Sequence, residues 1–258
     1  MPDTLTTEQM STYHRDGFVM LPAVLGPGEC NTIITHMMDL HAGRKALDGF
    51  EPRAADNWDR VFQHHLYDDI AMALLLDPRL RGPIADCLED EPEAVQAMYF
   101  YKGSEQHRHQ DQYYLPGCMG IWIALVDVGP DNGTLTVQPG SHRGHLVTKR
   151  ELQERYVTDD FETFDPRYES AVDEVLERNR SELGMGDEVP IKAGPGDVVL
   201  FHGALIHGGS PIVEPGAFRH VISNHYIPYS FAQWPNPKWA RLGFDGVERF
   251  TTNADNQA

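Results

Sequence analysis

The first ninety residues place their hydrophobic positions at helical spacing, and the residues around them mark where each helix should begin and end. Residues 5–17 (LTTEQMSTYHRDG) predict a capped helix, in which Thr6 is the N-cap and Gln9, three residues later, completes a capping box. Gly17 then follows as the residue that ends the helix. A short strand-like run, FVMLPAVL, comes directly after it.

Two further helical stretches complete this N-terminal region. Pro27 opens one that reaches about His41, because proline fits the first turn of a helix. Residues 69–90 carry the same periodicity, which we expect Pro78 and Pro83 to break. The region is therefore predicted to form a mostly helical layer.

From Ala94 onward the pattern changes to short runs of aromatic and β-branched residues, separated by Gly, Pro, Asn and Asp. The runs are AVQAMYFYK, MGIWIALVDV, GTLTVQPGS, GDVVLFHGALIHGGS and FRHVISNHYIPY. Short strands with turn signals between them are typical of a sandwich or barrel rather than of alternating βαβ units. We therefore expect a mainly β fold with flanking helices: a jelly-roll barrel of the double-stranded β-helix (cupin-like) type beside the N-terminal helical layer.

We interpret the 258 residues as a single domain, since barrels with helical decoration commonly reach this length. Its predicted parts are N-terminal helices over about 1–92, the barrel over about 93–232 and a C-terminal tail over 233–258. Residues 149–190 interrupt the barrel with a charged, partly helical stretch that is too long for a hairpin loop. We expect this stretch to be an insertion that forms a lid over the barrel mouth.

The chain carries a formal net charge of −18, so its surface repels phosphate backbones and anionic lipid headgroups. Nucleic acid and membranes are therefore poor partners, and the field favours a neutral or cationic small-molecule substrate over a polyanion. No stretch approaches the roughly 18 apolar residues of a membrane span, and the N-terminus shows no targeting pattern, which predicts a cytoplasmic protein. The three cysteines are widely spaced and are predicted to be buried thiols.

Candidate chemistry begins with the segment HRHQDQYYLPG at 107–117. In an extended strand residues i and i+2 face the same way, so His109 and Asp111 can present an imidazole and a carboxylate side by side, with Gln110 turned away. A second histidine from another strand would complete the triad of two histidines and one carboxylate that binds non-haem iron and leaves positions open for a cosubstrate and O2. In a chain with 13 histidines this motif alone also fits a surface pair.

The second histidine is predicted in the strand-like run GPGDVVLFHGALIHGGS at 194–210. His207 ends the run before two glycines, whereas its rival His202 lies five positions earlier and would face the opposite side of an extended strand. Arg219 begins the next run, twelve residues after His207. The planar fork of an arginine matches a carboxylate bidentately, which suits the far end of a cosubstrate, although a salt bridge at the barrel rim also fits.

Alternation along the strands adds candidates for the substrate pocket. In FRHVISNHYIPY, Ser223 and His225 share a face with Arg219, so they fit either the pocket or core packing. Aromatic residues near the motif could line the substrate side, although aromatic residues in strands usually lie in the core. The aromatic candidates are Tyr101, Tyr113 and Tyr114.

In their order and spacing these segments resemble the phytanoyl-CoA dioxygenase family of Fe(II)- and 2-oxoglutarate-dependent oxygenases, and the resemblance covers most of the chain. It is carried by the N-terminal pattern TxEQxxxYxxDGFVxLP, by KGS followed by HQDxxY, by the WxAL strand, by NGTLTVQPGSHRGH (132–145), and by GDVVLFHGALIHGGS followed by FRHxIS. The resemblance implies that His109, Asp111 and His207 bind Fe(II), and that Arg219 binds the C5 carboxylate of 2-oxoglutarate.

The resemblance also implies that Gln110 and Trp122 lie near the cosubstrate. The family often has HGS at the distal histidine, whereas this chain has HGGS, which shifts Ser210 by one place relative to its cosubstrate contact. Related halogenases replace the carboxylate ligand with a small residue, and the intact Asp111 therefore argues against halogenation.

The expected reaction oxidises, most simply hydroxylates, a C–H bond of a small polar or cationic metabolite or of a natural-product intermediate in secondary metabolism, with release of succinate and CO2. Two alternatives stay open. An acyl-CoA hydroxylase would favour a basic platform for the coenzyme's phosphates, which this acidic chain lacks. A non-catalytic ligand-binding barrel or a structural zinc site would favour a closed set of four ligands. Neither the substrate's identity nor the oligomeric state can be read from the sequence.

Overall fold

Two antiparallel sheets form the centre of the molecule in the computed structural model, which describes residues 3–52, 60–161, 165–213, 216, 218–232 and 240–249. The larger sheet has the order β1-β7-β4-β9-β3-β10-β11, with β2 also paired to β3, and the smaller sheet has the order β6-β5-β8. The larger sheet comprises β1 (Phe18–Leu21), β2 (Arg60–Phe62), β3 (Pro92–Phe100), β4 (Met119–Ala124), β7 (Val198–His202), β9 (Val221–Pro228), β10 (Arg241–Gly243) and β11 (Glu248–Arg249). The smaller sheet comprises β5 (Leu135–Val137), β6 (Val189–Pro190) and β8 (His207–Gly209). The predicted mainly β jelly-roll is confirmed.

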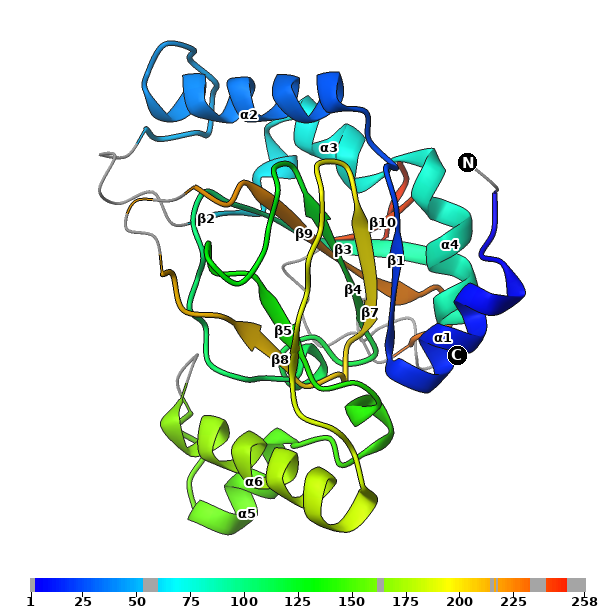
Figure 1. Ribbon diagram of the computed structural model, residues 1–258. Helices are drawn as coiled ribbons and strands as arrows, with labels where there is room; N and C mark the ends of the chain where they lie inside the picture. The colour runs from blue at the N-terminus through cyan, green and yellow to red at the C-terminus, as the bar shows by residue number, and fades with distance from the viewer. Residues whose placement is uncertain are drawn as a thin grey trace.

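Helices flank the sheets on several sides (Figure 1). The N-terminal helices are α1 (Thr7–Asp16), α2 (Pro27–His41), α3 (Asp69–Leu75) and α4 (Pro78–Leu88). The insertion contributes α5 (Lys149–Tyr156) and α6 (Pro166–Leu183), which lie together at the end of the molecule away from α2. The described residues also contain three short 3-10 helices: η2 (His64–Leu66), η3 (Asp111–Tyr113) and η4 (Ser141–Arg143). No helix in the described ranges is both long and apolar enough to cross a membrane.

The predicted boundaries of α1 are confirmed at both ends. The Thr6 side chain accepts a hydrogen bond from the Gln9 backbone N–H, and the Gln9 side chain accepts one from the Thr6 N–H. Gly17 follows the helix with φ 82°, a left-handed conformation that glycine adopts without a steric penalty. Such short-range signals are readable because both partners lie within one helical turn.

The expectation that Pro83 breaks its helix is wrong. The predicted break at Pro78 is confirmed, since α3 ends at Leu75 and Pro78 begins α4, but α4 continues through Pro83 to Leu88. Leu80, Pro83, Ile84 and Cys87 are the buried residues of α4 and form one stripe along it. Burial of this stripe offsets the hydrogen bond that an internal proline removes, a loss of roughly 3 kcal/mol in an isolated helix.

Strand β3 separates two hydrophobic cores. Tyr99 and Tyr101 belong to the core beneath the N-terminal helices, whereas Met98 and Phe100 belong to the core between the two sheets. The alternation follows from the strand period of two residues. β9 pairs with β3 so that Ser223 lies opposite Met98, and both side chains therefore face the same side of the larger sheet. The space between the sheets is where the functional side chains gather.

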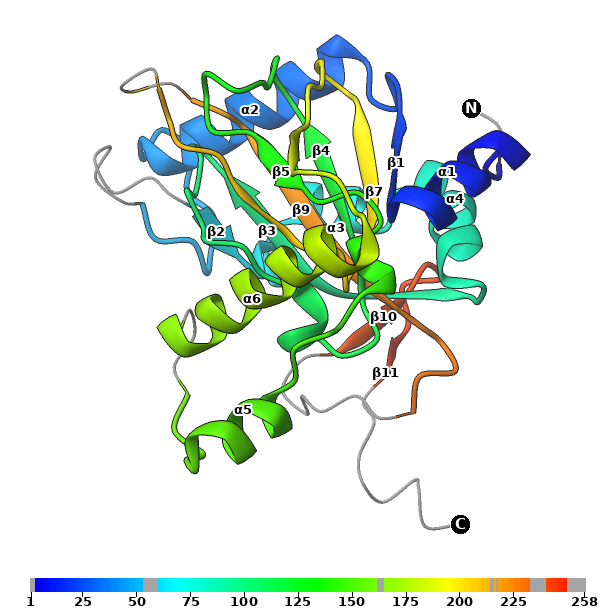
Figure 2. The ribbon, with the colours of Figure 1, turned by 60° about the horizontal axis from the view of Figure 1, so that its bottom comes forward.

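The insertion packs firmly against the barrel end. Figure 2 brings this end forward and shows α6 running across it, with α5 beside it. The hydroxyl of Tyr168, on α6, accepts a hydrogen bond of 2.8 Å from the Gln110 backbone N–H. Arg108 adds ion pairs to Asp173 and Glu188. The insertion is thus tied to the segment that carries the predicted metal ligands.

The predicted C-terminal tail contributes strands to the larger sheet. Within its described part, β10 pairs with β3, so that Leu242 lies opposite Ala94. Arg241 forms a buried ion pair of 2.5 Å with Glu93, which also pairs with Arg249. The sheet therefore extends beyond the predicted boundary at residue 232. All three cysteines are buried free thiols, as expected.

Candidate metal centre

His109, Asp111 and His207 meet at one buried point between the sheets. One potential ligand atom from each residue lies within 4.8 Å of the other two. Nε2 of His109 is 3.6 Å from Oδ1 of Asp111, and Nε2 of His207 is 3.6 Å from Oδ2. Among the described residues these form the one group of three or more His, Cys, Asp or Glu side chains with this spacing.

The local backbone differs from the continuous strand that the sequence suggested. His109 forms an isolated antiparallel bridge with His207, Gln110 is extended with φ −125° and ψ 120°, and Asp111 begins the 3-10 helix η3. The chain is extended only as far as Gln110, which is enough for His109 and Asp111 to face the same side. Immediately afterwards the chain turns out of the sheet.

The run 194–210 is also two strands rather than one. β7 ends at His202, a turn follows, and β8 begins at His207 in the smaller sheet. The prediction that His202 and His207 face opposite sides of a single strand therefore rested on a strand that does not exist. The structure nevertheless separates the two rings. His202 lies beside His142, with ring centroids 5.3 Å apart, and His207 lies 4.2 Å from His109 by the same measure.

Backbone carbonyl groups fix which nitrogen of each ring carries the proton. Nδ1 of His109 lies 2.8 Å from the His107 carbonyl oxygen, and Nδ1 of His207 lies 2.9 Å from that of Leu205. A carbonyl oxygen only accepts, so both Nδ1 atoms are protonated and both Nε2 lone pairs are directed toward Asp111. Two imidazole lone pairs and one carboxylate, with ring orientation set by backbone partners, fit the donor set of a non-haem Fe(II) site.

The protonation states suit metal binding as well. Burial lowers the pKa of His109 to about 3, and the His207 ring acts in the same direction, so the His109 ring is neutral near pH 7. Burial alone would raise the pKa of Asp111, but the rings of His207 and His225 outweigh it and hold that pKa below its usual range. His225 donates to Oδ2 of Asp111 through Nε2, at 2.9 Å. The site therefore presents a neutral His109 ring beside one carboxylate anion.

A cavity of about 60 Å³ opens beside the three residues. Arg219 lines it and is 3% exposed. One guanidinium nitrogen donates to the Gly133 carbonyl oxygen, Nε has no partner, and no carboxylate of the described chain pairs with the group. Burial lowers the pKa of Arg219 to about 10, which leaves it charged at neutral pH. An unpaired buried cation lining the cavity fits the distal carboxylate of 2-oxoglutarate.

Other predicted residues also line this inner cavity. Trp122, Ser223 and His225 do so, and the Arg219 guanidinium carbon lies 5.9 Å from the Trp122 ring centroid. Ser210 is not among the described lining residues, whereas Gly208 and Gly209 are. The extra glycine in HGGS therefore displaces the serine from the cavity wall.

Four of the predicted residues lie elsewhere. The Gln110 amide donates to the Ala204 and His145 carbonyl oxygens and accepts from the Val147 N–H, so this side chain joins three backbone segments outside the cavity. Tyr101 is in the core beneath the helices. Tyr113 stacks on Tyr168 at 3.8 Å, and the Tyr114 ring centroid lies 6.3 Å from that of His109. None of these four lines the cavity beside the triad.

Sequence reasoning missed several wall residues. Met98 and Phe100 follow from the same alternation that placed Ser223, once the register of β3 with β9 is known. Gln106 gave no signal in the sequence. Its amide nitrogen lies 3.1 Å from Nε2 of His109, consistent with an unprotonated Nε2.

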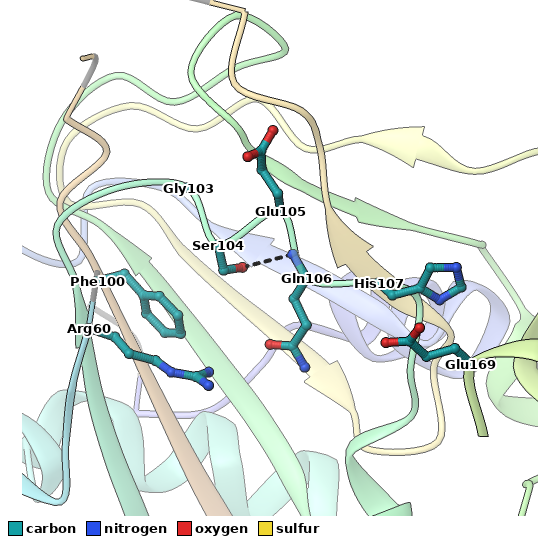
Figure 3. Close-up of a pocket in the computed structure, with 8 residues that line it drawn as sticks. All are labelled: Arg60, Phe100, Gly103, Ser104, Glu105, Gln106, His107 and Glu169. Carbon is teal, nitrogen blue, oxygen red and sulfur yellow. Dashed lines mark hydrogen bonds between the residues drawn. The ribbon is translucent and has the colours of Figure 1, made fainter. Parts of the chain in front are cut away.

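A second, outer cavity of about 400 Å³ shares part of its lining with the inner one, and Figure 3 shows the residues that line it. Phe100, Ser104 and Gln106 line both cavities, which makes them neighbouring chambers. Arg60 and Glu169 line the outer cavity alone. Its volume is in the range of small-molecule sites.

Comparisons with known proteins agree with this geometry. The model of the phytanoyl-CoA dioxygenase (PhyH) family matches residues 13–221. Phytanoyl-CoA dioxygenase 1 of Oryza sativa subsp. japonica is 32% identical over 92% of this chain and 94% of that protein. An ectoine dioxygenase of Sphingopyxis alaskensis is 25% identical over 82% of this chain and 72% of that protein.

Solved structures show the same fold. EctD from S. alaskensis with bound Fe superposes with a TM-score of 0.66 at 22% identity, over 88% of this chain and 79% of that one. HygX from Streptomyces hygroscopicus, with nickel and 2-oxoglutarate bound, gives a TM-score of 0.62 at 20% identity, over 88% and 89%. With the family model and the rice relative both spanning most of its length, the chain belongs to the phytanoyl-CoA dioxygenase family of Fe(II)- and 2-oxoglutarate-dependent oxygenases.

Proposed function

We propose that the protein hydroxylates a C–H bond of a small polar or cationic metabolite, or of a natural-product intermediate, and releases succinate and CO2. In this proposal His109, Asp111 and His207 hold Fe(II), and Arg219 binds the C5 carboxylate of 2-oxoglutarate. The observation that carries the proposal is the pair of Nε2 lone pairs directed toward one buried carboxylate, each ring held by a backbone carbonyl group.

When bound, Fe(II) with 2-oxoglutarate and O2 supplies the oxidising chemistry. The chain's own residues supply the geometry. The carbonyl groups of His107 and Leu205 hold the two rings, and His225 holds the Asp111 carboxylate through its hydrogen bond. These supports keep the donor atoms in place without relying on the metal itself.

The inner cavity's walls complete this arrangement. Phe100, Trp122 and Phe201 give it apolar walls, which exclude bulk water from the reacting centre. Arg219, buried among them, supplies a positive charge at a fixed place. An anionic cosubstrate would therefore be held at its far end and kept in one orientation.

The outer cavity bears on the substrate class. Most of its described lining residues carry polar side chains, two of them the carboxylates Glu105 and Glu169, and Arg60 is the one arginine or lysine among them. A substrate of the acyl-CoA class, as the rice relative's name indicates for that protein, would bring several phosphate charges to a chain of net charge −18. The lining and the charge support a small polar or cationic compound instead.

The test combines metal selectivity with cosubstrate turnover. The purified protein is assayed for succinate formation from 2-oxoglutarate with Fe(II) or with Zn(II), alone and with members of a metabolite panel that includes an acyl-CoA. We expect Fe(II)-dependent succinate formation that a small polar compound stimulates, and its loss in Asp111→Ala. Tight binding of Zn(II) without turnover under any condition would instead support a structural metal site.

A further inference from the structure

The outer cavity is the chamber from which a molecule would reach the metal-binding residues. It shares the walls formed by Phe100, Ser104 and Gln106 with the inner cavity. The Gln106 amide reaches Nε2 of His109, so this side chain stands at the boundary between the chambers. A compound bound in the outer cavity therefore has Gln106 between it and the centre, and its reacting carbon must pass that boundary.

Four charged or titratable side chains line the outer cavity, and three of them make contacts within the protein (Figure 3). Glu105 accepts a hydrogen bond of 3.0 Å from the Ile212 N–H. His107 lies 3.4 Å from the Asp173 carboxylate. The Arg60 guanidinium carbon lies 5.8 Å from the Phe100 ring centroid.

Glu169 differs from these three. Across the described ranges no hydrogen bond or ion pair engages its carboxylate, although the side chain is half-buried against the cavity. The nearby acids of the insertion are paired, since Arg108 bonds to both Asp173 and Glu188. Figure 3 shows Glu169 beside His107, across the cavity from Phe100 and Arg60. A partly desolvated carboxylate with no partner is a group that a cation would satisfy.

The structure also fixes where this carboxylate lies relative to the metal centre. Glu169 follows Tyr168, which is fully buried and whose hydroxyl accepts from the Gln110 N–H at 2.8 Å. Gln110 stands between the two ligands His109 and Asp111. The hydrogen bond between Tyr168 and Gln110 therefore connects the residue next to Glu169 with the residue between the two ligands. It holds the Glu169 carboxylate at a fixed place relative to the metal centre.

We propose that Glu169 binds a cationic nitrogen of the substrate, an amine, guanidine or quaternary ammonium group, and so holds the reacting carbon toward Gln106 and the metal centre. This inference rests on the proposed function and narrows its substrate class to small cations. A charge-assisted contact of this kind contributes roughly ten- to hundredfold to affinity, toward the lower end for a half-buried group.

The test compares matched probes and matched variants. The probes are cadaverine, agmatine and choline, each assayed beside an uncharged counterpart. The counterparts are N,N′-diacetylcadaverine, N-(4-acetamidobutyl)urea and 3,3-dimethyl-1-butanol, respectively. The variant is Glu169→Gln. Its control is Glu182→Gln, an exposed carboxylate on the same helix that lines neither cavity. The readout is probe-stimulated succinate formation, with KM and kcat determined separately.

We expect at least one cation, and none of the uncharged counterparts, to stimulate turnover. Glu169→Gln should raise KM for that cation roughly tenfold with little change in kcat, whereas Glu182→Gln should leave both unchanged. Turnover of 2-oxoglutarate without added probe should be the same in Glu182→Gln and in the wild type. If the wild type turns over 2-oxoglutarate without a probe but responds equally to charged and uncharged probes, or to no cation, the proposal is overturned. An unchanged KM in Glu169→Gln would overturn it as well. Absence of basal 2-oxoglutarate turnover in the wild type would overturn the proposed function instead.

Discussion

His225 donates a hydrogen bond of 2.9 Å from Nε2 to Oδ2 of Asp111, the carboxylate that faces His109 and His207. The donor lies in β9 of the larger sheet, and the acceptor lies at the start of η3, 114 residues earlier in the chain. The bond occupies one side of the carboxylate and fixes its rotation. The remaining lone pairs are thereby directed toward the space between the two rings.

Removing the His225 N–H donor should weaken metal binding at the site. Partners of ligand side chains typically contribute roughly 10- to 100-fold to metal affinity. We expect His225→Leu to weaken Fe(II) binding by that amount, as measured by anaerobic equilibrium dialysis. His225→Gln retains an N–H donor and should recover part of the loss. Equal affinity in His225→Leu and the wild type would mean that the carboxylate is held by other contacts.

Arg219 governs binding of the cosubstrate rather than of the metal. Charge-assisted hydrogen bonds contribute roughly 1.5–3 kcal/mol each, so Arg219→Ala should weaken 2-oxoglutarate binding by about ten- to several-hundred-fold. Arg219→Lys keeps the charge but lacks the bidentate fork, so its affinity for 2-oxoglutarate should lie between those of the wild type and Arg219→Ala. A 2-oxoglutarate titration at saturating substrate, with iron content measured in parallel, tests this. An unchanged apparent KM for 2-oxoglutarate in Arg219→Ala would mean that another cation binds the cosubstrate.

Gly209 is required by close packing beside the cavity. A Cβ atom there would lie 3.0 Å from the backbone nitrogens of Glu105 and Gln106 and 3.1 Å from Oγ of Ser104. Gly209→Ala should therefore displace the 104–106 segment and cost about 1–3 kcal/mol of unfolding free energy. Gly28→Ala is the control, because a Cβ at that exposed helical position meets nothing within 4 Å. Urea unfolding of both variants measures the difference, and equal stability would contradict the packing argument.

Acid should destabilise the fold through buried histidines such as His64. Burial lowers the pKa of His64 to about 4, whereas an unfolded histidine titrates near 6.5. Between these values the unfolded chain binds a proton that the folded chain does not, so unfolding free energy falls as the pH falls. From pH 7 to pH 5 this residue accounts for about 2 kcal/mol. Urea unfolding at both pH values should show a smaller loss for His64→Gln than for the wild type; an equal loss would remove His64 from this effect.

Local signals and the motif segments made much of the architecture predictable. The capping box of α1 involves Thr6 and Gln9, three residues apart, and needs no tertiary information. The meeting of His109 with His207 was expected from two motifs in distant strands, and the isolated bridge between them bears this out. The structure brings His207, and not His202, together with His109 and Asp111, although the single strand on which this choice was argued does not exist.

The remaining errors concern contacts that no short segment encodes. Tyr101 directly follows β3 and packs in the core beneath the N-terminal helices, whose residues lie far from it in sequence. The partners of Gln110 come from three distant backbone segments, so its position outside the cavity could not be read from the HQD motif. Glu169 reaches the outer cavity only because α6 folds back onto the barrel end.

The measurement that tests the central claim most directly is the number of Fe(II) ions bound per chain in the wild type, His207→Ala and His202→Ala, determined by anaerobic equilibrium dialysis. His207 contributes one of three ligand atoms within 4.8 Å of one another, whereas His202 lies beside His142 outside the cavity. We predict one ion per chain in the wild type and in His202→Ala, and loss of binding in His207→Ala. Retained Fe(II) in His207→Ala, or its loss in His202→Ala alone, would contradict the assignment of the metal centre.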